Sequence, residues 1–134
     1  MRKRLASALG FTLPELLLMA AILSYTFSVI LLSFITSMAI NEDSRNLTVA
    51  NSHAQFVMEE IKNTAFGSIG TNITTGNWTW NTAAVGTHGL TAIKNESITT
   101  TYTGSTLLDI IVTVYWTNAN GRARNKSLRT LLGS

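Results

Sequence analysis

A run without a charged side chain, Leu16–Ile40, constrains this chain more than any other feature. At about 1.5 Å per residue, a helix of that length is roughly 38 Å long, which exceeds the roughly 30 Å hydrocarbon core of a bilayer. The rest of a chain of 134 residues is too small to cover such a helix on every side. The run therefore predicts a membrane-spanning helix, and the basic residues before it predict a cytoplasmic N-terminus.

Basic residues are concentrated ahead of the uncharged run. Three of the ten Lys and Arg residues are Arg2, Lys3 and Arg4, and the remaining seven equal the seven acidic residues. The net charge of +3 therefore belongs to the first residues and does not argue for nucleic-acid binding by the whole chain. The chain has no cysteine, which excludes disulfides and thiolate metal sites.

Helical periodicity continues beyond Ile40, where no Gly or Pro interrupts the chain. Apolar residues recur at intervals of three and four, which is typical of an amphipathic helix with one buried stripe. We therefore expect one continuous helix over about residues 12–65, ended by Gly67 and Gly70, which tolerate positive φ. The apolar positions after the run are Leu47, Ala50, Ala54, Val57 or Met58, Ile61 and Ala65.

Residues 67–134 are rich in Thr, Asn and Gly between short apolar runs, a composition typical of strands and turns. The clearest expected strand is Leu107–Thr117, in which alternate residues form an apolar face. Asn118–Gly121 supplies turn residues, and Arg122–Leu131 is expected to return as the antiparallel partner. Weaker strands are expected near Trp78–Trp80, Leu90–Ile93 and Ser97–Thr103.

These elements predict an α+β fold. A long N-terminal helix, about residues 12–65 with its first half transmembrane, packs on a small C-terminal antiparallel sheet of three or four strands. The sheet and the amphipathic half of the helix are expected to fold together, because neither buries enough apolar surface alone.

A compact motif lies where the basic residues meet the uncharged run. Gly10 is followed by Phe11, and Glu15 is the fifth residue counted from Phe11. A charged residue beside a membrane helix is costly, so Glu15 is a candidate functional residue. The simpler alternative is that Glu15 is an acidic residue of the first helical turn, where the helix dipole favours negative charge.

This junction resembles the signal of type IV prepilins and pseudopilins: a short basic leader, Gly before the cut, Phe after it, and Glu at the fifth mature position. The resemblance implies that a membrane-embedded prepilin peptidase cleaves between Gly10 and Phe11 and N-methylates Phe11. It also implies that Glu15 meets the new amine of a neighbouring subunit, which would offset part of the cost of removing the charge from water. Pro14 stands where many family members have an aliphatic residue, and proline is tolerated in the first turn.

The resemblance also implies a division of the chain and a place in the cell. Residues 1–10 would be the cleaved leader, residues 11–40 the transmembrane and assembly helix, and residues 41–134 a periplasmic or extracellular domain. That domain would contain an amphipathic helix at 41–65 and the sheet at 67–134. The implied function is a structural, non-enzymatic subunit of a type IV pilus or a type II secretion pseudopilus, without a cofactor. Its partners would be prepilin peptidase, other subunits and the bacterial inner membrane.

Two other targeting interpretations stay open. Arg2–Arg4 and the small residues at Ser37–Ala39 suit an ordinary secretory signal peptide, although the apolar region of such a signal usually has about 7–15 residues. An uncleaved single-pass anchor of a periplasmic domain is the second alternative, and it leaves the pair Gly10–Phe11 without a role.

The strand Val112–Trp116 and the basic strand after it are similar to the C-terminal part of minor pilins and minor pseudopilins. Arg122, Arg124 and Lys126 alternate along that basic strand, so we expect them to share one face. The simpler interpretation is a charged solvent face that discourages aggregation at the sheet edge. The alternative is a contact for a neighbouring subunit or for DNA, as in a competence-type pilin.

The remaining candidate residues carry weaker signals. His53 and His88 are the only histidines, and no pair of residues has metal-ligand spacing, so we predict neither a metal site nor a catalytic base. Trp78 and Trp80 lie two residues apart, and we expect both to pack within the sheet.

Overall fold

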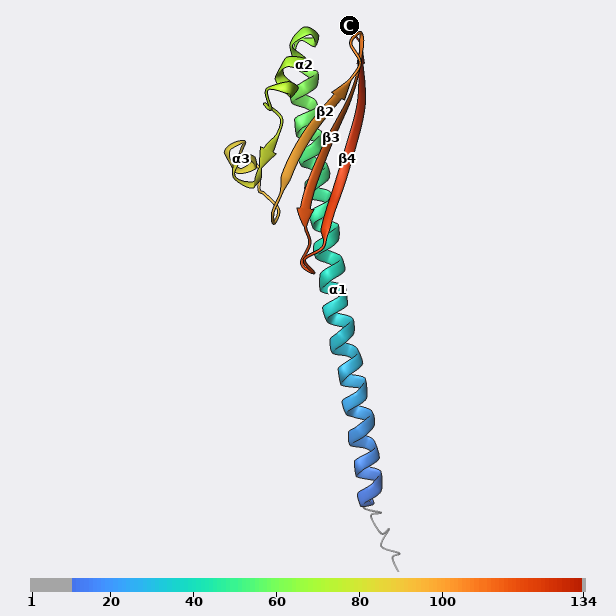
Figure 1. The fold of residues 1–134 in the computed structure, drawn as a ribbon. Coiled ribbons are helices and arrows are strands. Elements are labelled where there is room, and N and C mark those ends of the chain that lie inside the picture. The colour runs from blue at the N-terminus through green and yellow to red at the C-terminus, as the bar shows by residue number, and fades with distance from the viewer. Residues whose placement is uncertain (1–10, 134) are drawn as a thin grey trace, which may run out of the picture. The chain divides into compact units, whose positions relative to one another are not determined.

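The computed structural model describes residues 11–133, so the expected leader at residues 1–10 lies outside the described residues. The chain forms two compact units that divide after Met38. We refer to residues 11–38 as the apolar segment and to residues 39–133 as the head. In chain order the elements are α1 (Leu13–Lys62), α2 (Phe66–Thr74), β1 (Trp80–Asn81), α3 (Thr82–Thr87), β2 (Ser97–Thr103), β3 (Leu107–Thr117) and β4 (Ala123–Gly133) (Figure 1).

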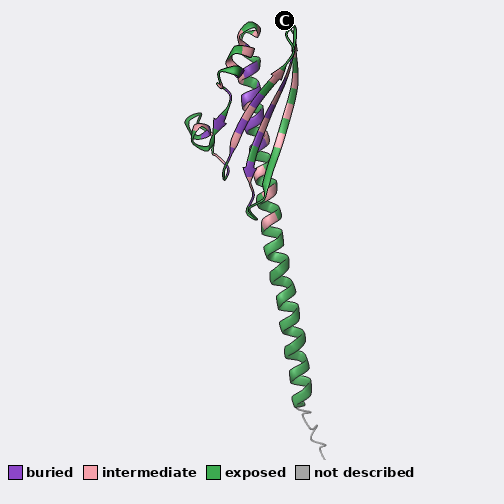
Figure 2. Cartoon of the chain, in the orientation of Figure 1, coloured by how far each residue is buried: buried purple, intermediate pink, exposed green. Residues whose placement is uncertain are grey.

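The apolar segment is the first half of α1, and every one of its residues is exposed (Figure 2). It is helical because it is rich in Leu, Ile, Met and Ala, and because no Gly or Pro follows Pro14 within α1. Its apolar residues cover the whole circumference, without the polar side that a soluble amphipathic helix presents to water. This part of α1 is long and apolar enough to cross a membrane.

The head contains a four-stranded sheet in the order β1-β2-β3-β4, in which every neighbouring pair is antiparallel. β3 pairs with β4 along its whole length, from Leu107 opposite Gly133 to Thr117 opposite Ala123. The turn before β3 contains Gly104 at φ +95°, where an added Cβ would collide with the Leu107 carbonyl oxygen. This turn therefore requires glycine.

The core of the head lies between the sheet and the second half of α1. Every second residue of β3 is buried, as the two-residue period of a strand requires. On α1, Ala50 and Ala54 are fully buried, and their small side chains let the sheet approach the helix closely. The buried β3 residues are Leu108, Ile110, Val112, Val114 and Trp116, and the buried apolar α1 residues are Ala50, Ala54, Val57, Met58 and Ile61.

The expected α+β fold is confirmed, with one long helix packed on an antiparallel sheet. The expected strands at Ser97–Thr103 and Leu107–Thr117 are confirmed to the residue. The expected partner strand is present as β4, and the expected strand near Trp78–Trp80 is reduced to the two residues of β1.

Two expectations about the C-terminal half were wrong. Gly67 and Gly70 do not end the long helix, which ends at Lys62; both lie inside α2. Ile69 and Ile73 are buried on α2, and this burial outweighs a helix penalty of about 1 kcal/mol for each glycine. Gly70 also lies where a Cβ would come within 3.0 Å of the Tyr102 hydroxyl, so its small size suits close packing of α2 on β2.

The expected strand at Leu90–Ile93 is also wrong, because these residues form an irregular connection. The backbone N–H of Ile93 donates to Glu96 Oε2 at 2.7 Å, and its carbonyl accepts from the Glu96 N–H at 3.2 Å. A side chain and a local turn thus satisfy backbone groups that a strand would have paired across the sheet. The short helix α3 was likewise unexpected; Asn81 caps it by accepting from the Ala84 N–H at 2.9 Å.

Candidate functional site

The start of α1 carries the two described residues of the cleavage and assembly motif, Phe11 and Glu15; Gly10 lies outside the described residues. The Thr12 N–H donates to Glu15 Oε2 at 3.5 Å, and the first helical hydrogen bond runs from the Leu16 N–H to the Thr12 carbonyl at 3.0 Å. Thr12 and Glu15 have the spacing of a capping box. Glu15 therefore helps to start the helix, while Phe11, 64% exposed, stands immediately before it.

Four hydroxyl side chains within the apolar segment donate hydrogen bonds to carbonyls of the helix itself. Ser24 donates to the Ala20 carbonyl at 2.8 Å, and Thr36 donates to the Leu32 carbonyl at 2.9 Å. Thr26 and Ser28 make bonds of the same kind. Such bonds leave no unpaired hydroxyl at these positions, which suits apolar surroundings. Glu15 is then the only charged side chain between Phe11 and Asn41.

At the beginning of the head, Asp43 of α1 connects to the turn between β3 and β4. Its Oδ2 accepts from Arg124 Nη2 at 3.4 Å and from Asn118 Nδ2 at 3.5 Å. Asn118 is 2% exposed, and its Oδ1 accepts from the Arg122 N–H at 2.8 Å. These bonds hold the end of the β3–β4 hairpin against α1.

Arg122, Arg124 and Lys126 do not all belong to the C-terminal strand. Arg122 precedes β4, so the expected face shared by all three is formed only by Arg124 and Lys126. These two stand opposite Trp116 and Val114 in the register, so they lie on the face of the sheet that carries the core. Arg124 is nevertheless exposed and Lys126 is half-buried, so the interpretation of a charged solvent face stays a prediction for both.

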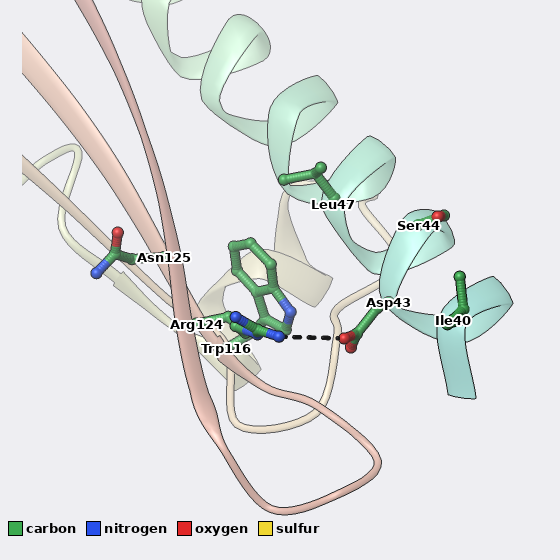
Figure 3. Close-up of a pocket in the computed structure, with 7 residues that line it drawn as sticks. All are labelled: Ile40, Asp43, Ser44, Leu47, Trp116, Arg124 and Asn125. Carbon is green, nitrogen blue, oxygen red and sulfur yellow. Dashed lines mark hydrogen bonds and ion pairs between the residues drawn. The ribbon is translucent and has the colours of Figure 1, made fainter. Parts of the chain in front are cut away.

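A groove of about 330 Å³ adjoins the Asp43–Arg124 pair (Figure 3). Figure 3 shows the two charged groups pointing toward one another, with the Trp116 ring lining the same groove. Trp116 is 4% exposed, and its Nε1 has no hydrogen-bond partner among residues 11–133. The other lining residues are Ile40, Ser44, Leu47 and Asn125.

His53 forms a buried pair with Glu96, which the sequence did not suggest. Nδ1 of His53 lies 2.6 Å from Glu96 Oε1, and the other carboxylate oxygen accepts from the Ile93 N–H. The Thr82 hydroxyl also donates to the Glu96 carbonyl at 2.8 Å. Forty-three positions separate His53 and Glu96, so no local pattern could have indicated the pair. These contacts bind α1 to the connection before β2.

Trp78, Trp80 and His88 serve packing. Both tryptophans are buried, as expected, although only Trp80 belongs to a strand. The indole N–H of Trp78 donates to Glu60 Oε2 at 3.2 Å, and that of Trp80 donates to the Asn77 carbonyl at 2.8 Å. His88 stacks on Trp80 with ring centroids 3.8 Å apart. Within residues 11–133, no three His, Asp or Glu side chains gather as a cation site would require.

Two places in the chain thus combine polar and apolar groups in ways that suit binding. At the start of α1, one carboxylate stands at the end of a fully exposed apolar helix. In the head, an ion pair lines a groove together with Trp116, whose buried indole N–H has no partner among residues 11–133. No family model, no curated protein and no solved structure matches this sequence.

Proposed function

We propose that this chain is a structural subunit, a minor pilin or minor pseudopilin, of a type IV pilus or a type II secretion pseudopilus. Prepilin peptidase cleaves it after Gly10 and N-methylates Phe11, and α1 then assembles into the filament. The observation that carries the proposal is the apolar segment, in which every residue is exposed and Glu15 is the only charge.

The apolar segment supports the proposal because every one of its residues is exposed. Exposed apolar surface costs about 25 cal/mol per Å² in water, so a surface this long requires lipid or other protein around it. A bilayer supplies such surroundings before assembly, and the packed helices of neighbouring subunits supply them afterwards. The membrane of this proposal is the bacterial inner membrane, and the basic residues at the N-terminus support an orientation with the head on the periplasmic side.

Glu15 supports the assembly step. Cleavage after Gly10 would give Phe11 a positively charged amine, four residues before Glu15. The only bond that the structure gives the Glu15 carboxylate is the long one from the Thr12 N–H to Oε2, so within residues 11–133 Oε1 has no partner. A neighbour's amine at Oε1 would pair two charges that are otherwise desolvated at a cost of several kcal/mol each.

The DNA-binding alternative receives less support. Arg124 is paired with Asp43, and Arg122 lies outside β4, so only Arg124 and Lys126 of the three basic residues share a face of the strand. An uncleaved anchor remains the simplest rival, and it predicts no role for Glu15 beyond helix capping.

The proposal is tested by Glu15→Ala in the native host, compared with Glu59→Ala, which removes an exposed carboxylate from the same helix within the head. Glu15→Ala is expected to permit cleavage and to reduce incorporation into filaments at least tenfold, because an amine is left buried and unpaired. Glu59→Ala is expected to leave both unchanged. Sheared or purified filaments, quantified by immunoblot against total cleaved protein, give the ratio. Normal incorporation of the Glu15→Ala chain would contradict the proposal.

A further inference from the structure

The groove beside Trp116 lies next to the end of the uncharged run. Ile40, which closes that run, is one of its lining residues, and Asp43 stands three positions further along α1. At about 1.5 Å per residue, Asp43 lies roughly 5 Å along the helix from Ile40. With the run in the hydrocarbon core, the groove therefore lies at the depth of the lipid headgroups.

The polar wall of the groove offers one positive and one negative group. The distance of 3.4 Å between Arg124 Nη2 and Asp43 Oδ2 is long for a charge-assisted bond, which is usually about 2.7–2.9 Å. The side chains of Arg124 and Asp43 are 51% and 35% exposed, so both can be reached from solvent. Among residues 11–133, Oδ1 of Asp43 has no hydrogen-bond partner. A zwitterionic ligand matches this wall, whereas a simple anion on Arg124 would also face the Asp43 carboxylate.

Trp116 supplies an independent indication of a ligand. Its indole N–H is buried without a partner among the described residues, a condition that costs about 1–3 kcal/mol. Trp78 and Trp80, the other two tryptophans, both donate hydrogen bonds. An acceptor atom held by Arg124 at this wall would give the third indole its partner.

The apolar wall and the size of the groove fit the same kind of ligand. Ile40 and Leu47 lie beside the charged pair, and both are exposed. A volume of about 330 Å³ is at the small end of ligand pockets, which suits a headgroup with its glycerol rather than a whole lipid.

We propose that this groove binds the headgroup of phosphatidylethanolamine. The phosphate accepts from Arg124 and from Trp116 Nε1, the primary ammonium donates to Asp43, and the glycerol backbone lies against Ile40 and Leu47. The site holds the head against the membrane surface before assembly. It rests on the part of the proposed function that inserts the uncharged run into the membrane.

The test uses the full chain, labelled with ¹⁵N-tryptophan, in dodecyl maltoside micelles, which contain neither phosphate nor amine. Dihexanoyl phosphatidylethanolamine is titrated in and the three indole resonances are followed by NMR. The Trp116 resonance, assigned with Trp116→Phe, is expected to move, while those of Trp78 and Trp80 stay in place. Phosphatidylcholine, whose ammonium has no N–H, and phosphatidylglycerol, which has no cation, are expected to bind about tenfold more weakly.

Matched variants test the separate roles of Arg124 and Asp43 in binding the headgroup. Arg124→Gln is expected to weaken binding of phosphatidylethanolamine about tenfold, because a charge-assisted bond to phosphate is lost. Asp43→Asn is expected to abolish the preference for phosphatidylethanolamine over phosphatidylglycerol. Arg122→Gln, which changes an exposed arginine outside the groove, is the control and is expected to bind as the unchanged chain does. Unmoved Trp78 and Trp80 resonances show that each variant keeps its core.

Several results would overturn the headgroup site. The first two are a Trp116 resonance that does not move and equal binding of all three lipids. The third is an equal response to inorganic phosphate. The fourth is a shift that depends on protein concentration in the absence of lipid, which would indicate that a second copy occupies the groove. A second measurement tests membrane insertion by itself: an inserted chain floats with phosphatidylethanolamine vesicles and stays with them after a carbonate wash. A chain that inserts but shows no lipid preference overturns only the headgroup site, whereas a chain that does not insert overturns the premise as well.

Discussion

The apolar segment and the head place their apolar side chains in opposite ways. In the apolar segment all residues are exposed, whereas the head buries a contiguous cluster between α1 and the sheet (Figure 2). One helix, α1, contributes to both. The head therefore buries apolar side chains in a core of its own, whereas the described residues leave the apolar segment uncovered.

The two regions also differ in the hydrogen bonds that a carboxylate accepts. Glu96 in the head is fully enclosed and accepts from both His53 and the Ile93 N–H, so each oxygen has a partner. Glu15 in the apolar segment is exposed and has one long bond from the Thr12 N–H. A carboxylate with its partners already present contributes to stability, whereas a carboxylate at the end of an apolar helix is a candidate functional residue.

The largest expected effect separates the two kinds of apolar residue. Ile110→Ala removes a fully buried side chain from the core, and we expect it to lower the free energy of unfolding of the head by about 2–5 kcal/mol. Leu23→Ala removes a side chain that is 71% exposed, and we expect a change within about 0.5 kcal/mol. Urea unfolding of the full chain in dodecyl maltoside, followed by tryptophan fluorescence, measures both. Similar losses for the two variants would break the distinction between the regions.

The next effect compares the two carboxylates. Glu96→Ala leaves His53 and the Ile93 N–H buried without their partner, and we expect it to destabilise the head by about 3 kcal/mol. Glu15→Ala is expected to leave unfolding of the head unchanged, because within residues 11–133 the one hydrogen bond of the Glu15 carboxylate is to Thr12. The same urea unfolding measurement applies, and a stable Glu96→Ala head would show that the buried pair contributes nothing.

A smaller effect tests why the second helix carries two glycines. At Gly67 an added Cβ would meet no atom within 4 Å, so we expect Gly67→Ala to stabilise the head by up to about 1 kcal/mol. At Gly70 the added Cβ would lie 3.0 Å from the Tyr102 hydroxyl, so we expect Gly70→Ala to gain less or to destabilise. Thermal unfolding of the two variants gives the difference. Equal stabilisation would mean that Tyr102 does not restrict α2.

The smallest effect concerns a carboxylate on the surface of the head. The hydrogen bond from Arg129 Nε to Asp109 Oδ1, 2.7 Å long, lowers the pKa of Asp109 from its ordinary value. Any stability from this pair is present above the ordinary Asp pKa of about 3.9 and is lost as pH falls through the lower folded value. We expect Arg129→Gln to raise the Asp109 pKa, measured by carboxyl NMR titration, with little change in stability at pH 7. An unchanged pKa would show that the ion pair does not form in solution.

The sequence predicted those helices and strands in which the spacing of apolar residues is uninterrupted. The alternation of Leu107–Thr117 gave β3 its bounds, and the spacing of Ala50, Ala54, Val57 and Ile61 gave the buried stripe of α1. α2 was missed because its helical spacing of Phe66, Ile69 and Ile73 is interrupted by two glycines that normally indicate a turn.

The sites in the head could not have been predicted, because their partners are distant in the sequence. Asp43 and Arg124 are 81 positions apart, and only the α1–sheet packing brings them together beside Trp116. The motif at Gly10, Phe11 and Glu15 lies within six consecutive residues, so the sequence alone shows it. What the structure adds there is that Glu15 also accepts from the Thr12 N–H and so takes part in helix capping.

The most direct test of the account is the intact mass of the mature chain isolated from its host. Cleavage by prepilin peptidase predicts a protein that begins at an N-methylated Phe11, with residues 1–10 missing, and fragmentation of the N-terminal peptide would place the methyl group on the amine. An intact Met1 would favour an uncleaved anchor, and a terminus near Ile40 would favour an ordinary secretory signal. Either result would contradict the proposal that the apolar segment is kept after processing and becomes the core of a filament.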